Sequence, residues 1–495
     1  MQKNYGKQIG RATKWSGITE IATKLIVPVV NMVLARLLTP EAFGVVATIT
    51  MVISFAELFT DAGFQKYIVQ HEFRDEVELN NSTNVAFWTN LCFSALICLV
   101  IFLFREPIAN LVGSPGLGNS ISIASLLIII AAFSSLQMAR YKRDFDFKTL
   151  FFVRVGSALI PLVVTIPLAI LLRNYWALLI GNIASHTFNA VVLTVKSKWR
   201  PSFYFNWKLL KEMFSFSIWT LLESIIIWLT SYIGIFIVGS YLDDYYLGLY
   251  KTSMSTVNAY MSIITSAVIP VLFSALSRYQ NDEINFHKTY YSFQRIVAVF
   301  VLPMGVGIYL FRELVTQILL GSQWMEASGF IGLWGLTSAV IIVYSYFASE
   351  VHRSKGKPKI SLATQTLHLL FVIPALLISV KLDFKTLYIT RSLIRIQSLV
   401  TALLVMQLLH GLKITKVLKN TLPMILSTVV MGVLGYFLKQ LSGSVVWHFA
   451  VIAICVVVYF AVLLGCFPKM RKELLESAFM KKILKKKSAP DNGEK

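Results

Sequence analysis

The chain has 495 residues, of which 56% are hydrophobic and only 14% are charged. Ordinary soluble domains have about 25% charged residues, so this composition excludes a typical soluble protein. The formal net charge of +21 would fit a protein that binds nucleic acid, but the basic residues lie between long apolar runs and not in one patch. We therefore expect no nucleic-acid partner.

Apolar runs recur from one end of the chain to the other. A helix needs about 20 apolar residues to cross the roughly 30 Å hydrocarbon core of a bilayer, and it satisfies its own backbone hydrogen bonds there. The sequence therefore predicts an all-α integral membrane protein with about fourteen spans. They are expected near residues 15–37, 43–63, 83–104, 119–138, 150–172, 175–195, 213–239, 249–273, 290–311, 327–349, 359–380, 387–409, 420–438 and 446–466.

The first apolar run is expected to stay in the mature protein, because it continues to about residue 38 and is too long for the core of a signal peptide. No metal site is expected either. The cysteines lie inside apolar runs without the spacing of metal ligands, so we interpret them as small packing residues. They are Cys92, Cys98, Cys455 and Cys466.

Lysine and arginine concentrate in every second connection between the predicted spans. Cytoplasmic loops of membrane proteins carry an excess of these residues, so the pattern predicts a multi-pass protein with both termini in the cytoplasm. An even number of spans agrees with this topology. The basic segments are residues 3–14, 140–148, 196–211, 353–359, 413–419 and 481–487, whereas the opposite loops hold only Arg36, Arg105, Arg173, Arg312, Lys381, Lys385 and Lys439.

Two short turns that end in glycine indicate an internal repeat. Gly44 follows the first predicted span and Gly248 follows the seventh, an offset of 204 residues that also superposes Trp15 on Trp219. Internal repeats are common in transporters, with the substrate site between them, although chance similarity among apolar segments is the alternative. We predict a six-helix half with its connecting loop, a second six-helix half, and two extra spans with a basic tail, at residues 1–212, 213–412 and 413–495.

Several segments resemble a known family. Residues 34–44 (LARLLTPEAFG) and 58–70 (LFTDAGFQKYIVQ) resemble the opening of Wzx-type polysaccharide transporters, which belong to the multidrug, oligosaccharidyl-lipid and polysaccharide exporter superfamily. Residues 247–250 (LGLY), 271–280 (VLFSALSRYQ) and 321–324 (GSQW) are similar to its lipopolysaccharide, colanic-acid and teichuronic-acid exporter branch. The resemblance implies a MATE-like fold, with two pseudo-repeat bundles around a central cavity.

The function that the resemblance implies is a flippase of the bacterial inner membrane. It would move polyprenyl-pyrophosphate-linked oligosaccharide repeat units by alternating access, while the polyprenyl tail stays among the membrane lipids. A polysaccharide polymerase and chain-length proteins are the candidate partner proteins. No cofactor is expected: the chain has no Walker A motif, so transport would draw on an H+ or Na+ gradient or on consumption of the product.

Two other classes of function compete with this one. A multidrug cation antiporter of the same superfamily would have an acidic cavity. A glycan polymerase or ligase would carry a large catalytic outer loop, whereas the longest outer segments here, near residues 105–118 and 312–326, are short. We therefore do not expect an enzyme.

Charged and polar side chains inside the predicted spans are candidate site residues, because a charge near mid-membrane costs at least about 2.5 kcal/mol. Arg391 and Arg395 lie one helical turn apart, so two guanidinium groups can bind one pyrophosphate. Snorkelling to the interface is the alternative for Arg391 and Lys251, and also for Arg154 and Arg295. The predicted substrate-binding residues are Lys24, Asn31, Lys251, Asn258, Arg391 and Arg395.

Three acidic residues are predicted to bind a coupling proton or cation: Glu57, Asp61 and Glu223. A desolvated carboxyl titrates closer to neutral pH, which suits a proton carrier, but neutralising a nearby lysine or arginine is an equal alternative. The aromatic residues Trp199, Tyr204 and Trp207 stand beside lysines and arginines. They are typical of an anchor at the membrane interface.

Overall fold

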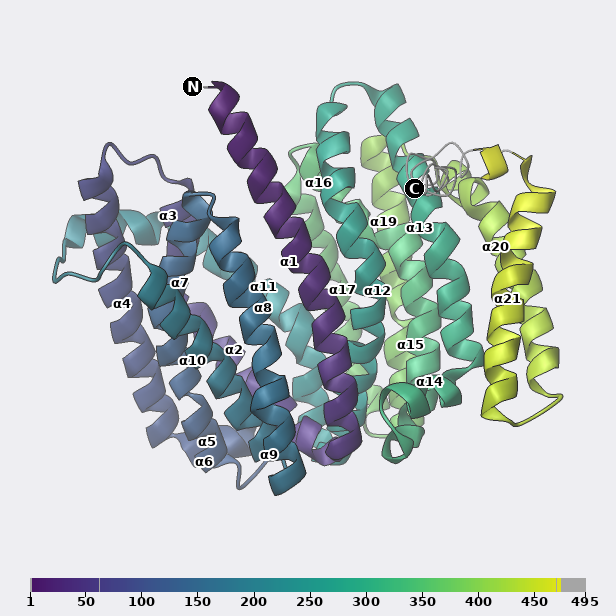
Figure 1. Cartoon of the computed structure of the whole chain (residues 1–495), viewed down its shortest axis with the longest axis horizontal. Coiled ribbons are helices and arrows are strands. Elements are labelled where there is room, and N and C mark those ends of the chain that lie inside the picture. Colours follow the sequence, from purple (N-terminus) through teal and green to yellow (C-terminus); the bar gives the residue numbers. More distant parts are fainter. Residues whose placement is uncertain (1, 62, 469, 473–495) are drawn as a thin grey trace, which may run out of the picture. The chain divides into compact units, whose positions relative to one another are not determined.

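The computed structural model describes residues 2–61, 63–468 and 470–472, and within them all side chains except those of residues 2–10, 61, 215–220, 223 and 358. Every regular element in this part of the chain is a helix (Figure 1). Within the same residues, 14 segments are long and apolar enough to cross a membrane. The predicted number of spans is confirmed.

Six of these segments precede the connection at residues 197–206, and two of the six are interrupted, at Ser125 and at Val164. The elements are α1 (Gln2–Leu37), α2 (Pro40–Asp61), α3 (Phe64–Gln70), α4 (Glu76–Leu103), α5 (Arg105–Leu111), α6 (Gly118–Ala124), α7 (Leu126–Arg143), α8 (Phe147–Val163), α9 (Thr165–Leu172) and α10 (Trp176–Lys196).

Eight segments follow the connection, beginning with two helices of 35 residues each. The elements are α11 (Trp207–Tyr241), α12 (Asp244–Arg278), α13 (Glu283–Leu310), α14 (Arg312–Leu319), the 3-10 helix η1 (Ser322–Ala327), α15 (Ser328–Ile341), the π-helical turn η2 (Ile342–Tyr346), α16 (Ala348–Ser354), α17 (Pro358–Ser379), α18 (Phe384–Leu393), α19 (Arg395–His410), α20 (Ile414–Lys439) and α21 (Val445–Cys466).

Aspartate and asparagine side chains fix where several helices begin. The first N–H groups of a helix lack partners within the helix, and a side-chain oxygen that accepts from them stabilises it by about 0.5–2 kcal/mol. Asn206 accepts from the backbone of Lys208 and Leu209, which starts α11 six residues before the predicted span. Aspartates do the same for α4, α8, α13 and α18, namely Asp75, Asp146, Asp282 and Asp383.

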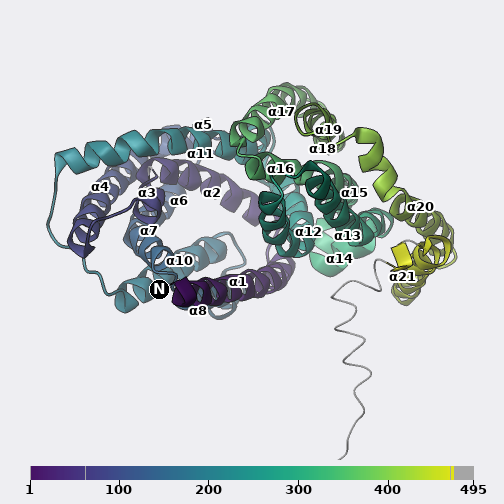
Figure 2. The same cartoon turned by 90° about the horizontal axis from the view of Figure 1, so that it is seen from above.

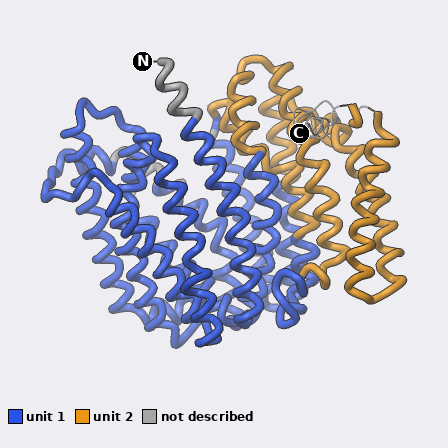
Figure 3. The backbone as a smooth tube through the Cα atoms, in the orientation of Figure 1, with its two compact units in different colours: residues 1–267, 316–334, 357–398 blue, residues 268–315, 335–356, 399–495 orange. Residues whose placement is uncertain are grey.

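The chain forms two compact units, which Figure 3 colours separately. Unit 1 holds residues 1–267, 316–334 and 357–398, and unit 2 holds the rest. In unit 1, α1 packs along α8, α7 lies against α4 and α10, and α11 lies against α2 and α17. In unit 2, α20 packs between α13 and α21, and Figure 2 shows α20 and α21 side by side. The units are discontinuous in sequence, so the predicted boundaries at residues 212 and 412 stay a prediction.

In unit 1, helices α2 and α12 touch backbone to backbone near their first turns. A Cβ atom added to Gly44 would lie 1.9 Å from the carbonyl oxygen of Asp244, and one added to Gly248 would lie 1.9 Å from the carbonyl oxygen of Pro40. Only glycine fits such a contact. The offset of 204 residues relates Gly44 to Gly248 and Pro40 to Asp244, so the two contacts are equivalent under the predicted repeat.

The same end of unit 1 is sealed by the segment that follows α14. The indole of Trp324 is fully buried, lies edge-on to Phe43 at 5.2 Å between ring centroids, and donates to the carbonyl of Ala35 at 2.7 Å. The Gln323 amide donates to the carbonyls of Ala35 and Leu38 at 2.6 and 2.8 Å. These bonds satisfy carbonyl groups at the C-terminus of α1. We call this part of unit 1, with the glycine contact, the closed end.

Candidate functional site

A cavity of about 590 Å³ lies in unit 1 beside the closed end. Its walls come mainly from α1, α2, α8, α10 and α12, and Phe43 and Leu320 border it on the side of the closed end. Half of the residues that line it are polar. The polar residues are Thr23, Asn31, Thr50, Arg154, Ser157, Thr165, Asn182, Asn189, Tyr232, Lys251, Thr252, Ser255, Thr256 and Tyr260.

The charge of the cavity wall is positive. Arg154 on α8 and Lys251 on α12 line it, and among the described lining residues there is no aspartate or glutamate. The Lys251 ammonium lies 5.7 Å from the ring centroid of Tyr232, a cation–π contact. Arg154 lies 3.4 Å from the Glu20 carboxylate, but both side chains are more than 40% exposed, so this ion pair neutralises little of the cavity's charge. The wall therefore attracts anions.

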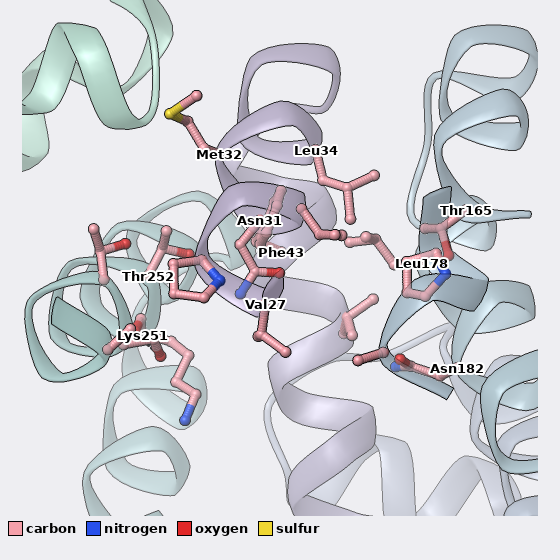
Figure 4. A pocket seen from close by; sticks show the side chains of 18 of the residues that line it. Val27, Asn31, Met32, Leu34, Phe43, Thr165, Leu178, Asn182, Lys251 and Thr252 are labelled. Atoms are coloured by element: carbon pink, nitrogen blue, oxygen red, sulfur yellow. Dashed lines mark hydrogen bonds between the residues drawn. The ribbon is translucent and has the colours of Figure 1, made fainter. Parts of the chain in front are cut away.

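Amide side chains supply the rest of the binding chemistry. Figure 4 shows Asn31 on α1 between Lys251 and Thr252 on one side and Asn182 on the other. Asn189 lies two helical turns beyond Asn182 on α10, hence on the same face of that helix. Its buried side-chain oxygen accepts no hydrogen bond from the described residues. Amide groups both donate and accept, so this wall suits the hydroxyl groups of a sugar.

The two predicted arginines form a separate cluster in unit 1. The guanidinium carbons of Arg391 and Arg395 lie 5.2 and 4.0 Å from the ring centroid of Trp334. The Trp334 indole donates to the Asn258 side-chain oxygen at 3.1 Å, and Arg391 Nε donates to the hydroxyl of the buried Tyr250 at 3.1 Å. We call these five residues the Trp334 cluster. Cation–π contacts of this kind hold both guanidinium groups in place.

The predicted substrate-binding residues are thus divided between two places. Asn31 and Lys251 line the cavity, whereas Asn258, Arg391 and Arg395 belong to the Trp334 cluster. Lys24 is half-buried on α1 and is not among the lining residues. The role of each residue in binding stays a prediction.

The residues for which snorkelling was the alternative also differ from one another. Arg154 lines the cavity of unit 1. Arg295 on α13 donates to the side chain of Asn420 on α20 at 2.5 Å, inside unit 2. Sequence reasoning did not single out Asn182 and Asn189. Their spacing of seven residues on an apolar helix was the available signal.

The acidic residues are only partly placed. Glu57 is half-buried on α2 and does not line the cavity, while the side chains of Asp61 and Glu223 lie outside the described residues. Within the described residues, no group of three histidine, cysteine, aspartate or glutamate side chains is arranged to hold a metal ion. Ion coupling through these carboxylates stays a prediction.

The spans and the polar cavity they surround are those of a multi-pass membrane protein. The family model described as polysaccharide biosynthesis protein matches residues 33–329, more than half of the chain, so the protein belongs to this family. The predicted family resemblance is confirmed.

Three bacterial proteins are similar to this chain in sequence. The succinoglycan biosynthesis transport protein ExoT of Rhizobium meliloti is 27% identical over 343 residues, which are 69% of this chain and 68% of ExoT. The lipopolysaccharide biosynthesis protein WzxC of Escherichia coli is 20% identical over 63% of each chain. The teichuronic acid biosynthesis protein TuaB of Bacillus subtilis is 20% identical over 65% of this chain and 66% of TuaB.

Solved structures resemble the protein in fold. The lipid II flippase MurJ, in an inward closed conformation, has a TM-score of 0.74 at 14% identity and covers 92% of this chain and 99% of its own. An inward-facing multidrug resistance MATE family transporter has a TM-score of 0.59 at 12% identity over 81% of this chain and 99% of its own. At such identities the likeness concerns the fold, and it confirms the predicted MATE-like helical fold.

Proposed function

We propose that the protein is a flippase that carries polyprenyl-pyrophosphate-linked oligosaccharide repeat units across the bacterial inner membrane for surface polysaccharide biosynthesis. The observation that carries this proposal is the cavity wall, which bears two cationic side chains and no acidic one among its described residues. A pyrophosphate needs cationic partners when it leaves water, and Arg154 and Lys251 supply them. The amides of Asn31, Asn182 and Asn189 match the sugar hydroxyls. The family match and the names of ExoT, WzxC and TuaB support the same assignment.

A multidrug cation antiporter shares this fold but fits the cavity poorly. Two basic side chains and no described acidic one give the wall a potential that repels organic cations. We also assign no enzymatic role, since the proposed reaction is translocation and leaves the covalent bonds of the substrate unchanged. An H+ or Na+ gradient acting through Glu57, Asp61 and Glu223 is the proposed source of energy, and membrane lipids and biosynthetic proteins are the proposed partners.

Unit 2 has an apolar cavity of its own. A second cavity of about 380 Å³ lies between α13, α20 and α21, lined by aliphatic and aromatic side chains such as Val299, Pro303 and Met431. No charged residue is among its described lining. Such a lining suits a hydrocarbon chain of the surrounding membrane, because burying CH2 groups stabilises a complex by about 0.8 kcal/mol each.

Our proposed topology places both termini in the cytoplasm, following the distribution of lysine and arginine. The closed end of unit 1 then lies on the periplasmic side. In an alternating-access cycle, α2 and α12 must separate at Gly44 and Gly248 before the cavity releases its substrate there. The cavity and the closed end together therefore define one binding step and one release step.

A deletion strain tests this function. We expect lipid-linked repeat units to accumulate on the cytoplasmic leaflet when the protein is absent, and the wild-type gene to remove them. An Arg154→Ala/Lys251→Ala variant should reach the membrane at normal abundance and leave the accumulation in place. The control Lys385→Ala, an exposed cation at the start of α18, should restore export. Normal surface polysaccharide in the deletion strain would rule out the proposed function.

A further inference from the structure

The connection between α10 and α11, together with the first residue of α11, carries three exposed aromatic rings. Residues 197–206 form no helix, and the exposed fractions of Phe203, Phe205 and Trp207 are 92%, 57% and 71%. Tyr204 and Asn206, between them, are half-buried. The rings of Phe205 and Trp207 lie side by side with centroids 6.3 Å apart, and Phe203 stands in a tight turn in which the Tyr204 N–H donates to the Ser202 carbonyl at 2.9 Å. We call residues 198–211 the aromatic strip.

Hydrogen bonds to α4 hold the strip in this conformation. The Ser202 N–H donates to the Asn84 side-chain oxygen at 3.2 Å, and the Asn84 amide donates to the Ser202 hydroxyl at 2.7 Å. The Trp88 indole donates to the Ser202 carbonyl at 2.9 Å. Phe203 stacks on Trp88 with centroids 4.6 Å apart and an interplanar angle of 12°. These contacts with α4 fix the backbone of the strip near Ser202, and with it the position of the Phe203 ring.

The opposite side of the strip belongs to the core of unit 1. Trp199 is 6% exposed and packs with a buried cluster that includes Phe87 and Met213, and Tyr204 packs against the same cluster. Of the residues predicted as interfacial anchors, Trp199 is therefore a core residue, Tyr204 is half-buried and Trp207 is outward-facing. Phe203 and Phe205 are exposed together with Trp207.

Basic residues flank the exposed rings. Lys198, Lys208 and Lys211 are exposed. Of the acidic residues nearby, Glu212 lies 3.4 Å from the Tyr67 hydroxyl, and Asp144 interacts electrostatically with Lys198. Arg200 is engaged with backbone carbonyls at the end of α10. The span predicted from the sequence begins near residue 213, so the first turn and a half of α11 precedes it. Rings with adjacent lysines at the edge of a span match the boundary between acyl chains and headgroups.

We propose that the aromatic strip binds anionic phospholipid headgroups. Phe203, Phe205 and Trp207 lie at the acyl boundary, and the ammonium groups of Lys198, Lys208 and Lys211 bind phosphate groups of the leaflet. Charge complementarity selects acidic over zwitterionic lipids, and the apolar rings select a lipid surface over free phosphate. Unlike the cavity, this site acts on the resident membrane and does not depend on the transported substrate.

Spin labels test the depth of the strip. The full-length protein, with its four free cysteines replaced, is labelled at Phe203→Cys or Phe205→Cys and placed in nanodiscs of phosphatidylethanolamine and phosphatidylglycerol. We expect both labels to collide with oxygen more than with a water-soluble nickel complex. The half-buried Tyr204→Cys serves as the matched control and should be shielded from both. Aqueous accessibility at positions 203 and 205 would overturn the proposal and leave the strip as a surface for a soluble protein.

Counting bound lipids tests the headgroup. Native mass spectrometry of the purified protein compares phosphatidylglycerol with phosphatidylcholine, for the wild type and for a Lys198→Gln/Lys208→Gln/Lys211→Gln variant. A lysine near a lipid surface contributes roughly fivefold in binding, so the variant should lose most of its preference for phosphatidylglycerol. A Lys413→Gln/Lys416→Gln/Lys419→Gln variant carries the same change in charge and should keep the preference. Equal losses in both variants would show a general charge effect and overturn the site.

Discussion

Gly44 and Gly248 pack reciprocally: each lies against the backbone carbonyl that begins the other's helix, with no room for a Cβ atom. The predicted repeat makes the two glycines equivalent, so one pseudo-symmetric contact joins α2 and α12. The contact forms part of the closed end. Substituting either glycine therefore tests whether the closed end opens and closes at this contact.

Alanine at either glycine should prevent the closed end from forming. A methyl group 1.9 Å from a carbonyl oxygen forces the helices apart, and overpacking of this kind costs about 1–3 kcal/mol. We expect Gly44→Ala and Gly248→Ala to make the buried position Thr48→Cys reactive towards a membrane-impermeant maleimide added from outside. Gly17→Ala, which meets nothing within 4 Å, should leave it protected. Protection in all three variants would contradict the prediction.

Lys251 should contribute to substrate affinity through its charge. A hydrogen bond to a charged group contributes about 1.5–3 kcal/mol, so Lys251→Gln should weaken binding of a pyrophosphate-linked lipid by roughly tenfold or more. Lys251→Arg keeps the charge and should lose much less. Titration of the purified protein with substrate, beside the exposed control Lys385→Gln, measures the difference. Equal affinity in Lys251→Gln and the wild type would remove Lys251 from the site.

Arg391 and Arg395 should separate a binding role from a packing role. Both hold Trp334 by cation–π contacts, each worth about 0.5–2 kcal/mol. If they also bind the pyrophosphate, an Arg391→Ala/Arg395→Ala variant should reach the membrane and fail in export. Trp334→Leu removes the stacking partner and its hydrogen bond to Asn258 but keeps both arginines, so it serves as the control for stability. Full export from a well-expressed double variant would assign both arginines to packing.

Glu313 should make unit 2 sensitive to acid. Burial alone would raise the pKa of its carboxyl, but hydrogen bonds from Lys439 and Arg312, each 2.9 Å long, outweigh burial and lower the pKa below its ordinary value of 4.5. A lowered pKa in the folded state contributes stability above pH 4.5 that is lost as the pH falls through the folded value.

Thermal unfolding between pH 7 and pH 3 tests this linkage in purified protein. Glu313→Gln should unfold at a lower temperature than the wild type at pH 7, and the two curves should converge in acid. Lys439→Met removes the partner and should reduce the same difference, with little further loss in the double variant. Parallel curves for the wild type and Glu313→Gln at all pH values would show that Glu313 carries no such contribution.

The spans were predictable because lipid makes hydrophobicity along the chain an almost sufficient signal. The interruption at Val164 was not predicted, although Pro161 stands one turn earlier and removes a backbone donor. The glycine pair at positions 44 and 248 indicates the repeat offset from the sequence alone. Backbone contacts of this kind constrain sequence strongly, since glycine alone fits them.

The candidate site was harder to predict than the spans, and α12 shows why. Lys251 and Asn258 lie seven residues apart, nearly on one face of an ideal helix. In the fold, Lys251 borders the cavity, while the side-chain oxygen of Asn258 accepts a hydrogen bond from the indole of Trp334 on α15. The sequence defines the polar stripe of a helix, but the neighbouring helices decide which cavity each part of the stripe meets.

The hydrogen bonds from Gln323 and Trp324 to the end of α1 also determine whether water or lipid can fill the closed end when it opens. When the seal breaks, the carbonyls of Ala35 and Leu38 lose their donors, and a buried carbonyl without a partner costs about 1–3 kcal/mol. Hydrocarbon has no donor to replace them, but water does. Opening is therefore a hydration event: water must reach the carbonyl groups as the indole leaves, and a lipid-filled gap would drive the seal shut again.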